Sequence, residues 1–483
     1  MRYPLSRAAL AGALLAVTVP LAAPAVGRAQ AVPLPPIGGG EGGPAGRGLT
    51  TLPAPKREPV PGEREPPALP MPRPHPGPLG TAHAYDLDGL TALTLQRNPR
   101  LAQGAFAIDS AAGRAVQAGL YPNPTVAVYQ DEIADRTGPG GILTAPQIKQ
   151  EIVTAGKLRL DRAAAEREVD QATFNLASLR YGRLAAVRQA YFEVLTLQRR
   201  LRILNDLFGL AEKTFETSER LLKAGQASRL DIVQLEVERE RFRADREATQ
   251  RELPAAFRRL AAAVGVSDLP EGPLAGSLDQ AMPTYELTTA QRFVVESHPD
   301  IFAAKAGVKR AEFLLERARV EPIPNVTVQA SYIRQYENRS RDFGLGVTVP
   351  VPAWNQNQGN IAASKARLGE AVQEVGRTEN ELVERLGQAY GPYASARRRA
   401  ELYRSSILPR ARESYDIALK AYQNGRFDYL RVLEAQRVYS QADLEYVRSL
   451  GEAWRAAAEL SGLLLQENWP GCAPSLEIVP PSK

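Results

Sequence analysis

Apolar residues at helical spacing fill most of this chain, interrupted by short segments with a strand-like pattern. Between residues 87 and 120 the apolar positions recur every three or four residues, which predicts helix. Residues 157–223 continue this period without a proline, a length of about 100 Å at the standard helical rise. Residues 228–264 are also predicted to be helical. Helices far longer than the usual dozen residues favour antiparallel coiled-coil packing.

Two pairs of shorter segments have the partial alternation of half-buried strands. The first pair covers residues 125–130 and 142–153. The second pair covers 326–336 and 343–351, separated by a polar loop at 337–341. Each pair predicts a β-hairpin. The fold class is therefore mainly α with a small β part of about four strands.

The second half of the chain repeats the order of the first. Pro99 and Pro299, which open similar helical runs, are 200 residues apart, and so are Gly225 and Gly425. Two distant pairs with one spacing predict an internal two-fold repeat whose unit is too long for a solenoid. Each of the two glycines is expected to form the turn of a helical hairpin.

The second-half helices are predicted over 287–320, from the end of the last strand to about Tyr422, and over 427–465. Proline has no N–H and clashes with the preceding helical turn. Pro392 and Pro409 are therefore expected to interrupt the long middle helix.

These patterns divide the chain into six segments. They are a signal peptide at 1–31, a Pro- and Gly-rich linker at 32–84, a first repeat at 85–265, a connection at 266–286, a second repeat at 287–465 and a C-terminal tail at 466–483. Arg2 and Arg7 precede an apolar run and small-residue triplets, as in an export signal, although an N-terminal membrane anchor is an alternative. No later stretch approaches the ~20 apolar residues of a spanning helix. The linker is expected to be disordered or extended.

Composition narrows the function. The only cysteine is Cys472, so an exported chain must be stabilised by packing or by assembly. The 60 basic and 54 acidic residues are interspersed, which favours solvated helix faces over nucleic-acid binding. The sequence has three histidines and lacks the phosphate-loop, metalloprotease and serine-hydrolase motifs. We therefore predict no enzyme, no cofactor and no metal site.

The strands suggest a shared pore. In an outer membrane every backbone polar group must be paired, so a sheet must close. Membrane barrels start at about eight strands, so several chains would have to share one barrel. Aromatic residues lie near the strand ends, as in membrane girdles: Tyr121, Tyr129, Tyr332, Tyr336, Phe343 and Trp354. The alternative is a sheet that caps a soluble helical bundle, as in a periplasmic coiled-coil adaptor or scaffold.

Four stretches carry a family resemblance: 98–101 (NPRL), 118–124 (AGLYPNP), 407–414 (ILPRARES) and 421–436 (AYQNGRFDYLRVLEAQ). In their order and spacing, the chain resembles the TolC-like outer-membrane efflux proteins, and most closely their heavy-metal CzcC/CusC branch. The resemblance implies a homotrimer with a twelve-stranded β-barrel in the outer membrane, in contact with its lipid. Below it, the long helices would form an α-barrel that projects into the periplasm.

The resemblance also implies a function. The trimer would be the passive exit duct of a tripartite efflux system that conducts metal ions or small toxic molecules. Its partners would be a periplasmic adaptor and an inner-membrane pump of the RND type. A duct for type I protein secretion is an alternative, because ducts of this family serve several kinds of pump.

Site residues follow from the same resemblance. The hairpin turns at Gly225 and Gly425 would form the periplasmic end. Asp231 and Tyr422 match two residues whose hydrogen bond holds the gate shut. For Asp231 a local role is equally expected, since it stands three residues after Ser228, as in a helix capping box.

The resemblance also predicts a pore constriction. Glu434 matches an acidic residue that lines the narrowest ring of the family's pore. Arg431 replaces a second acidic residue there, so in a trimer the ring would carry mixed charge and be less cation-selective. The alternatives are an i, i+3 ion pair between Arg431 and Glu434, and a plain solvated helix face.

Overall fold

A computed structural model describes residues 85–133, 141–223, 228–267, 269–424, 426 and 429–470. Several predictions lie outside these ranges: the signal peptide at 1–31, the linker at 32–84, the turn glycines Gly225 and Gly425, and Cys472. Within the ranges that are described, no helix is both long and apolar enough to cross a membrane.

The helices of the first half are α1 (Leu87–Arg97), α2 (Pro99–Ala118), α3 (Lys157–Lys223) and α4 (Arg229–Val264). α3 has 67 residues, as its proline-free period predicts. The single helix expected over 87–120 is corrected to two, because the backbone is extended at Asn98. The residue before a proline avoids helical geometry, whereas the proline itself is favourable at the first position of a helix.

The second half has α5 (Leu287–Ser297), α6 (Pro299–Val320), α7 (Gln358–Leu402), a π-helical turn η1 (Tyr403–Ile407), α8 (Leu408–Gln423) and α9 (Tyr429–Leu463). The helix expected over 287–320 is likewise two, with a break at His298 before Pro299. The His298 Nδ1 atom accepts a hydrogen bond from the Asp300 backbone N–H at 3.2 Å, so it caps α6.

The two prolines of the long middle helix behave differently. α7 continues through Pro392, so the expected break there is wrong. The regular helix is interrupted ahead of Pro409 by η1, a wider turn whose hydrogen bonds join residues five apart instead of four. A proline ring clashes with the carbonyl four residues earlier, and that residue, Ser405, lies inside η1. The wide turn therefore accommodates Pro409, and the helical path continues from α7 through η1 into α8.

The strands β1 (Thr125–Asp131), β2 (Ile142–Ile152), β3 (Val326–Gln335) and β4 (Arg341–Thr348) form one antiparallel sheet in the order β1-β2-β3-β4. The two predicted hairpins thus join through β2 and β3, where Ile148 lies opposite Ala330. β1 and β4 form the two edges of this sheet. The predicted fold class, mainly helical with a small sheet of four strands, is confirmed.

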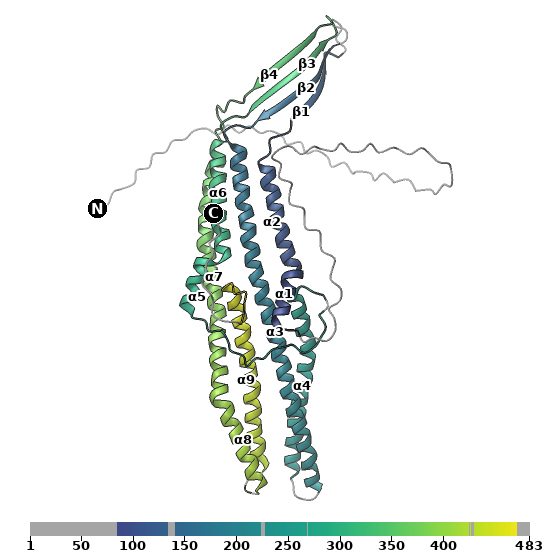
Figure 1. The fold of residues 1–483 in the computed structure, drawn as a ribbon, viewed down its shortest axis with the longest axis vertical. Coiled ribbons are helices and arrows are strands. Elements are labelled where there is room, and N and C mark those ends of the chain that lie inside the picture. Colours follow the sequence, from purple (N-terminus) through teal and green to yellow (C-terminus); the bar gives the residue numbers. More distant parts are fainter. Residues whose placement is uncertain are drawn as a thin grey trace, which may run out of the picture. The chain divides into compact units, whose positions relative to one another are not determined.

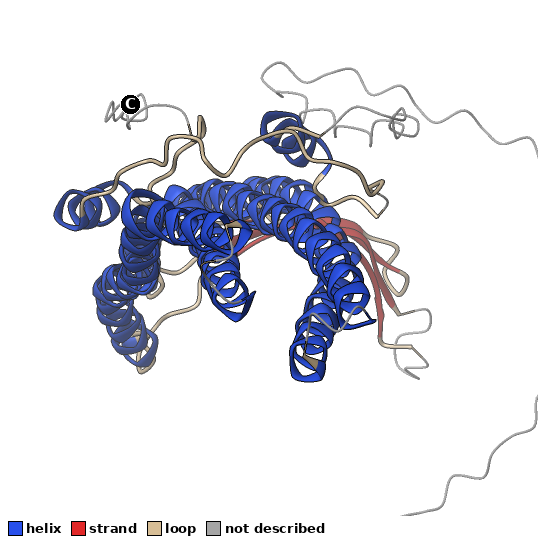
Figure 2. Cartoon of the chain, turned by 90° about the horizontal axis from the view of Figure 1, so that it is seen from below, coloured by secondary structure: helices blue, strands red, loops and turns tan. Residues whose placement is uncertain are grey.

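The sheet lies at one end of the described helices, and the hairpins α3–α4 and α8–α9 end at the other (Figure 1). Seen along their axes, the long helices stand side by side in one curved layer, and loop segments cross its convex side (Figure 2). α3 packs against α2, α4, α6 and α9, so it is the spine of the layer.

The main core forms a belt around the middle of α3. The rings of Phe192 and Trp454 stack at 4.4 Å, and Trp469 packs edge-on against both at 5.6 Å. Arg188 is fully buried beside them and donates hydrogen bonds to Ser461 Oγ and the Glu467 carbonyl. Burial lowers the pKa of the Arg188 guanidinium to about 10. The first residues of the predicted tail therefore belong to the core.

A hydrogen-bonded clasp joins the sheet to the helices. The buried Lys157, the first residue of α3, donates from Nζ to the Ile323 carbonyl at 2.6 Å and to Asn325 Oδ1 at 2.9 Å. Next to it, Thr154 Oγ donates to the Pro324 carbonyl at 2.7 Å. The clasp thus ties the junction between β2 and α3 to the junction between α6 and β3.

Candidate functional site

The sheet has one strongly apolar face. The register of β3 and β4 places Tyr332 opposite Phe343, Ala330 opposite Leu345 and Val328 opposite Val347, all on the same side. Phe343 is 83% exposed, Leu345 87% and Val347 68%. Such contiguous apolar exposure in a single chain marks an interaction surface.

The apolar face continues across the other two strands. Ile148 of β2 lies opposite Ala330, and Val126 of β1 lies opposite Ile148. Val126 is 67% exposed, and Trp354, which follows the last strand, is 91% exposed. A broad apolar band with aromatic residues at its margin is the surface that a membrane strand presents to lipid.

The opposite face of the sheet is polar. Gln329 and Ser331 of β3 lie opposite two glycines of β4, Gly346 and Gly344. A Cβ atom added to Gly346 would lie 2.6 Å from Gln329 Nε2, and one added to Gly344 would lie 2.6 Å from Ser331 Oγ. The glycines therefore leave the room that these polar side chains occupy. Sequence alternation alone had not revealed this pairing, because it depends on register.

At the far end of the first hairpin, Asp231 has the local role expected for it. Ser228 Oγ accepts a hydrogen bond from the Leu230 N–H at 3.2 Å, and Asp231 Oδ2 accepts one from the Ser228 N–H, also at 3.2 Å. These bonds form a capping box at the start of α4. Tyr422 is half-buried near the end of α8, on the other hairpin (Figure 1).

The two predicted constriction residues lie together. Arg431 and Glu434 are both exposed near the start of α9. They line a groove of about 560 Å³ between α8 and α9, with Arg410 and Glu413 on the α8 side. Two arginines and two glutamates therefore share this groove, and its charge is mixed.

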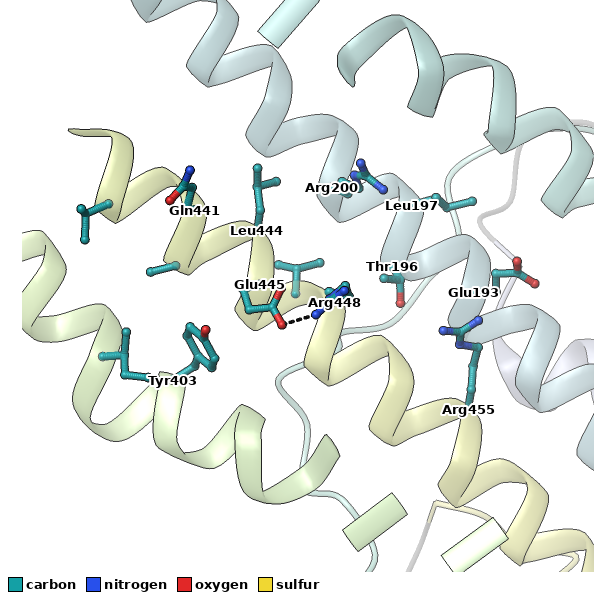
Figure 3. Close-up of a pocket in the computed structure, with 14 residues that line it drawn as sticks. Glu193, Thr196, Leu197, Arg200, Tyr403, Gln441, Leu444, Glu445, Arg448 and Arg455 are labelled. Atoms are coloured by element: carbon teal, nitrogen blue, oxygen red, sulfur yellow. Dashed lines mark hydrogen bonds and ion pairs between the residues drawn. The ribbon is translucent and has the colours of Figure 1, made fainter. Parts of the chain in front are cut away.

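A larger groove of about 840 Å³, which the sequence does not reveal, lies where α9 separates α3 from η1 (Figure 3). α3 contributes Leu197 and Arg200, η1 contributes Tyr403, and Leu444 comes from α9. The only sequence signal for it is Pro409, which accompanies η1. In the described part of the chain, no group of three or more His, Cys, Asp or Glu side chains is arranged to hold a metal ion.

The comparison with protein families decides the class of this chain. A family model described as "Outer membrane efflux protein" matches residues 90–266 and 294–464. The chain belongs to the outer membrane efflux protein family. The resemblance noted in the sequence is therefore confirmed. This outer membrane efflux protein is located in the outer membrane and extends into the periplasm, as predicted.

Two curated relatives show the breadth of the family. The cobalt-zinc-cadmium resistance protein CzcC of Cupriavidus metallidurans is 27% identical over 389 residues, which cover 80% of this chain and 91% of CzcC. The outer membrane protein OprJ of Pseudomonas aeruginosa is 24% identical over 267 residues, which cover 53% of this chain and 55% of OprJ.

Solved structures share the fold of this outer membrane efflux protein. The outer membrane protein VceC of Vibrio cholerae superposes with a TM-score of 0.65 at 19% identity, covering 78% of this chain and 95% of VceC. CusC, whose structures concern folding and transmembrane channel formation, also gives 0.65 at 17% identity, with 78% and 91% covered. At these identities the likeness establishes the fold alone.

Proposed function

We propose that this outer membrane efflux protein is the passive exit duct of a tripartite efflux system. The observation that carries the proposal is the two-faced sheet, with an exposed apolar band on one side and polar side chains over glycines on the other. A band of this kind suits contact with lipid, and the polar face suits a water-filled lumen.

The proposed duct is a homotrimer. In lipid the backbone groups at the edges of β1 and β4 need partners, because no water reaches them. Four strands are too few to close on themselves, whereas three chains give twelve, within the range of known barrels. The helical layers of three chains would then complete an α-barrel beneath the sheet.

We propose that the chain consists of two repeats, 85–265 and 287–465, joined by residues 266–286. Each repeat supplies one strand hairpin and one long helical hairpin. The two separate matches of one family model to this chain support this division. A signal peptide at 1–31, a linker at 32–84 and a tail from 466 complete the proposed organisation.

The proposed cargo is metal ions or small toxic molecules, with a periplasmic adaptor and an RND-type inner-membrane pump as partners. The likeness to CzcC, a cobalt-zinc-cadmium resistance protein, supports metal ions as the cargo. The experiment that tests the duct is single-channel recording of the purified full chain in planar bilayers, with its mass in detergent measured beside it. A trimer that conducts supports the proposal, and a monomer without conductance contradicts it.

Replacing Leu345 by arginine should prevent stable insertion in the outer membrane. An arginine on the lipid-facing side near the bilayer midplane costs about 2–4 kcal/mol, and a trimer repeats this cost three times. The measurement is the fraction of protein recovered with outer membranes. Gln329→Arg is the matched control, because Gln329 belongs to the polar face of the same sheet. If both variants insert equally well, the lipid-facing assignment is wrong.

We propose that Arg431 and Glu434 form the pore constriction, next to the turns at Gly225 and Gly425. Replacing Glu434 by glutamine should then lower the cation preference of the channel, because the trimer loses three carboxylates from one narrow ring. Reversal potentials in a salt gradient measure this preference. Glu312→Gln on α6 is the control, since Glu312 pairs with Lys309 on its own helix, far from the hairpin ends. Unchanged reversal potentials for Glu434→Gln would remove the selectivity role.

A further inference from the structure

One buried ion pair joins the two helical hairpins. The Glu238 side chain of α4 is 6% exposed, and Arg437 of α9 is 48% exposed. Arg437 Nη2 donates a hydrogen bond to Glu238 Oε2 at 3.0 Å. Among the described residues, Glu238 is the only buried carboxylate. Its partner comes from the other hairpin, 199 positions away in sequence.

Glu238 stands in an apolar row. On α4 the buried side chains before and after it are Leu235 and Phe242, and Phe242 belongs to a small apolar cluster with residues of α3. A carboxylate in such a row is costly unless a cation pairs with it. The 200-residue offset places Val438 at the position equivalent to Glu238, and Val237 at that of Arg437. The two charges are therefore not part of a pattern shared by both hairpins.

Nearer the sheet than the ion pair, α3 and α9 are closely packed. An added Cβ atom at Gly451 of α9 would overlap the Thr196 side chain of α3. One added at Gly462 would lie 2.6 Å from the Ala185 Cβ atom. Nearer the start of α9, Leu444 and Val438 line the large groove, and Leu444 also packs against the small apolar cluster of α3 and α4. The long side chain of Arg437 spans the space between α9 and α4 to reach Glu238.

The helix that pairs with α9 contains an irregular turn at the same groove. η1, between α7 and α8, contributes Tyr403 and Ile407 to the wall of the groove. A π-helical turn lacks the regular hydrogen-bond ladder and is a common place for a helix to bend. α3 has no such turn over its 67 residues. Bending at η1 would move α8 and the adjoining part of α9 relative to the uninterrupted α3.

We propose that the Glu238–Arg437 ion pair is a latch that holds the α8–α9 hairpin against the α3–α4 hairpin. When the pair separates, the α8–α9 hairpin swings about η1 and widens the end of the duct. This inference rests on the proposed duct function. It adds a closing contact distinct from the predicted gate at Asp231 and Tyr422, and above the hairpin turns.

The test is single-channel recording of the full chain with Arg437→Gln, Glu238→Gln and the exchange Glu238→Arg with Arg437→Glu. Each single change removes a charged hydrogen bond in every protomer, so the open fraction should rise about tenfold or more. The exchange restores an ion pair and should return the open fraction toward that of the native chain. Arg243→Gln is the matched control, because Arg243 pairs with Glu240 and Glu247 on its own helix.

The readouts separate the latch from a purely structural role and from the duct itself. The double change Glu238→Gln with Arg437→Gln leaves no buried charge, so it opens the channel even where a lone charge impairs folding. Amide hydrogen exchange in α8 and α9 should become faster in this variant than in Arg243→Gln. A native chain that conducts, with both readouts unchanged in the double variant, overturns the latch alone. A native chain that forms no channel overturns the duct function and the latch together.

Discussion

Replacing Trp454 by alanine should lower the free energy of unfolding by about 3–5 kcal/mol, the usual cost of deleting a buried aromatic side chain. Trp454 is fully buried, stacks on Phe192 and packs against Trp469. Its indole N–H also donates to the Leu278 carbonyl at 2.8 Å, which would lose its partner. Denaturant unfolding of the full chain in detergent, followed by circular dichroism, measures the loss.

Trp354→Ala is the matched control for this prediction. Trp354 is 91% exposed after the last strand, so its loss should leave the unfolding midpoint nearly unchanged. If Trp454→Ala and Trp354→Ala shift the midpoint by the same small amount, the aromatic belt around α3 is not the centre of stability.

Combining Asp231→Ala with Tyr422→Phe should raise the single-channel conductance, if these residues form the proposed gate. A hydrogen bond contributes about 1 kcal/mol, and a trimer would lose three of them. A change of about 3 kcal/mol is about a hundredfold in the balance between closed and open states. Recording in planar bilayers measures both the conductance and the open fraction.

The structure supplies a control for the gate experiment. Asp231 also completes the capping box of α4, so its removal weakens the helix start by about 1 kcal/mol. Ser228→Ala removes the other half of the same box and leaves the Asp231 carboxylate in place. A gate role predicts opening in the double variant but not in Ser228→Ala. Equal conductance in the two variants would indicate that Asp231 acts only as a cap.

Local sequence signals predicted the regular elements well. The helical period, free of proline, places α3 at its observed bounds, and the strand ends are predicted to within three residues. The errors come from proline. The breaks at Asn98 and His298 were hidden because the apolar period continues across them, although the following proline fixes each break. Pro392 shows the converse, since α7 keeps its path through a proline.

The candidate site was predictable only where partners are close in sequence. The capping role of Asp231 follows from Ser228, three residues earlier. The pair of Glu238 and Arg437 lies 199 positions apart and depends on how α4 approaches α9, which no local pattern encodes. The seating of Gln329 over Gly346 likewise depends on strand register. Family resemblance, rather than residue pattern, supplied the hypotheses for Tyr422, Arg431 and Glu434.

The clasp at Lys157 has a mechanical consequence. A buried ammonium group and a threonine hydroxyl fasten the β2–α3 junction to the α6–β3 junction, which resists movement of the sheet relative to these two helices. Tilting the strands relative to the helices would break the hydrogen bonds of Lys157 Nζ while this ammonium group is still shielded from water. In the proposed duct, the motions that open and close the passage are therefore expected at the opposite end, away from the strands.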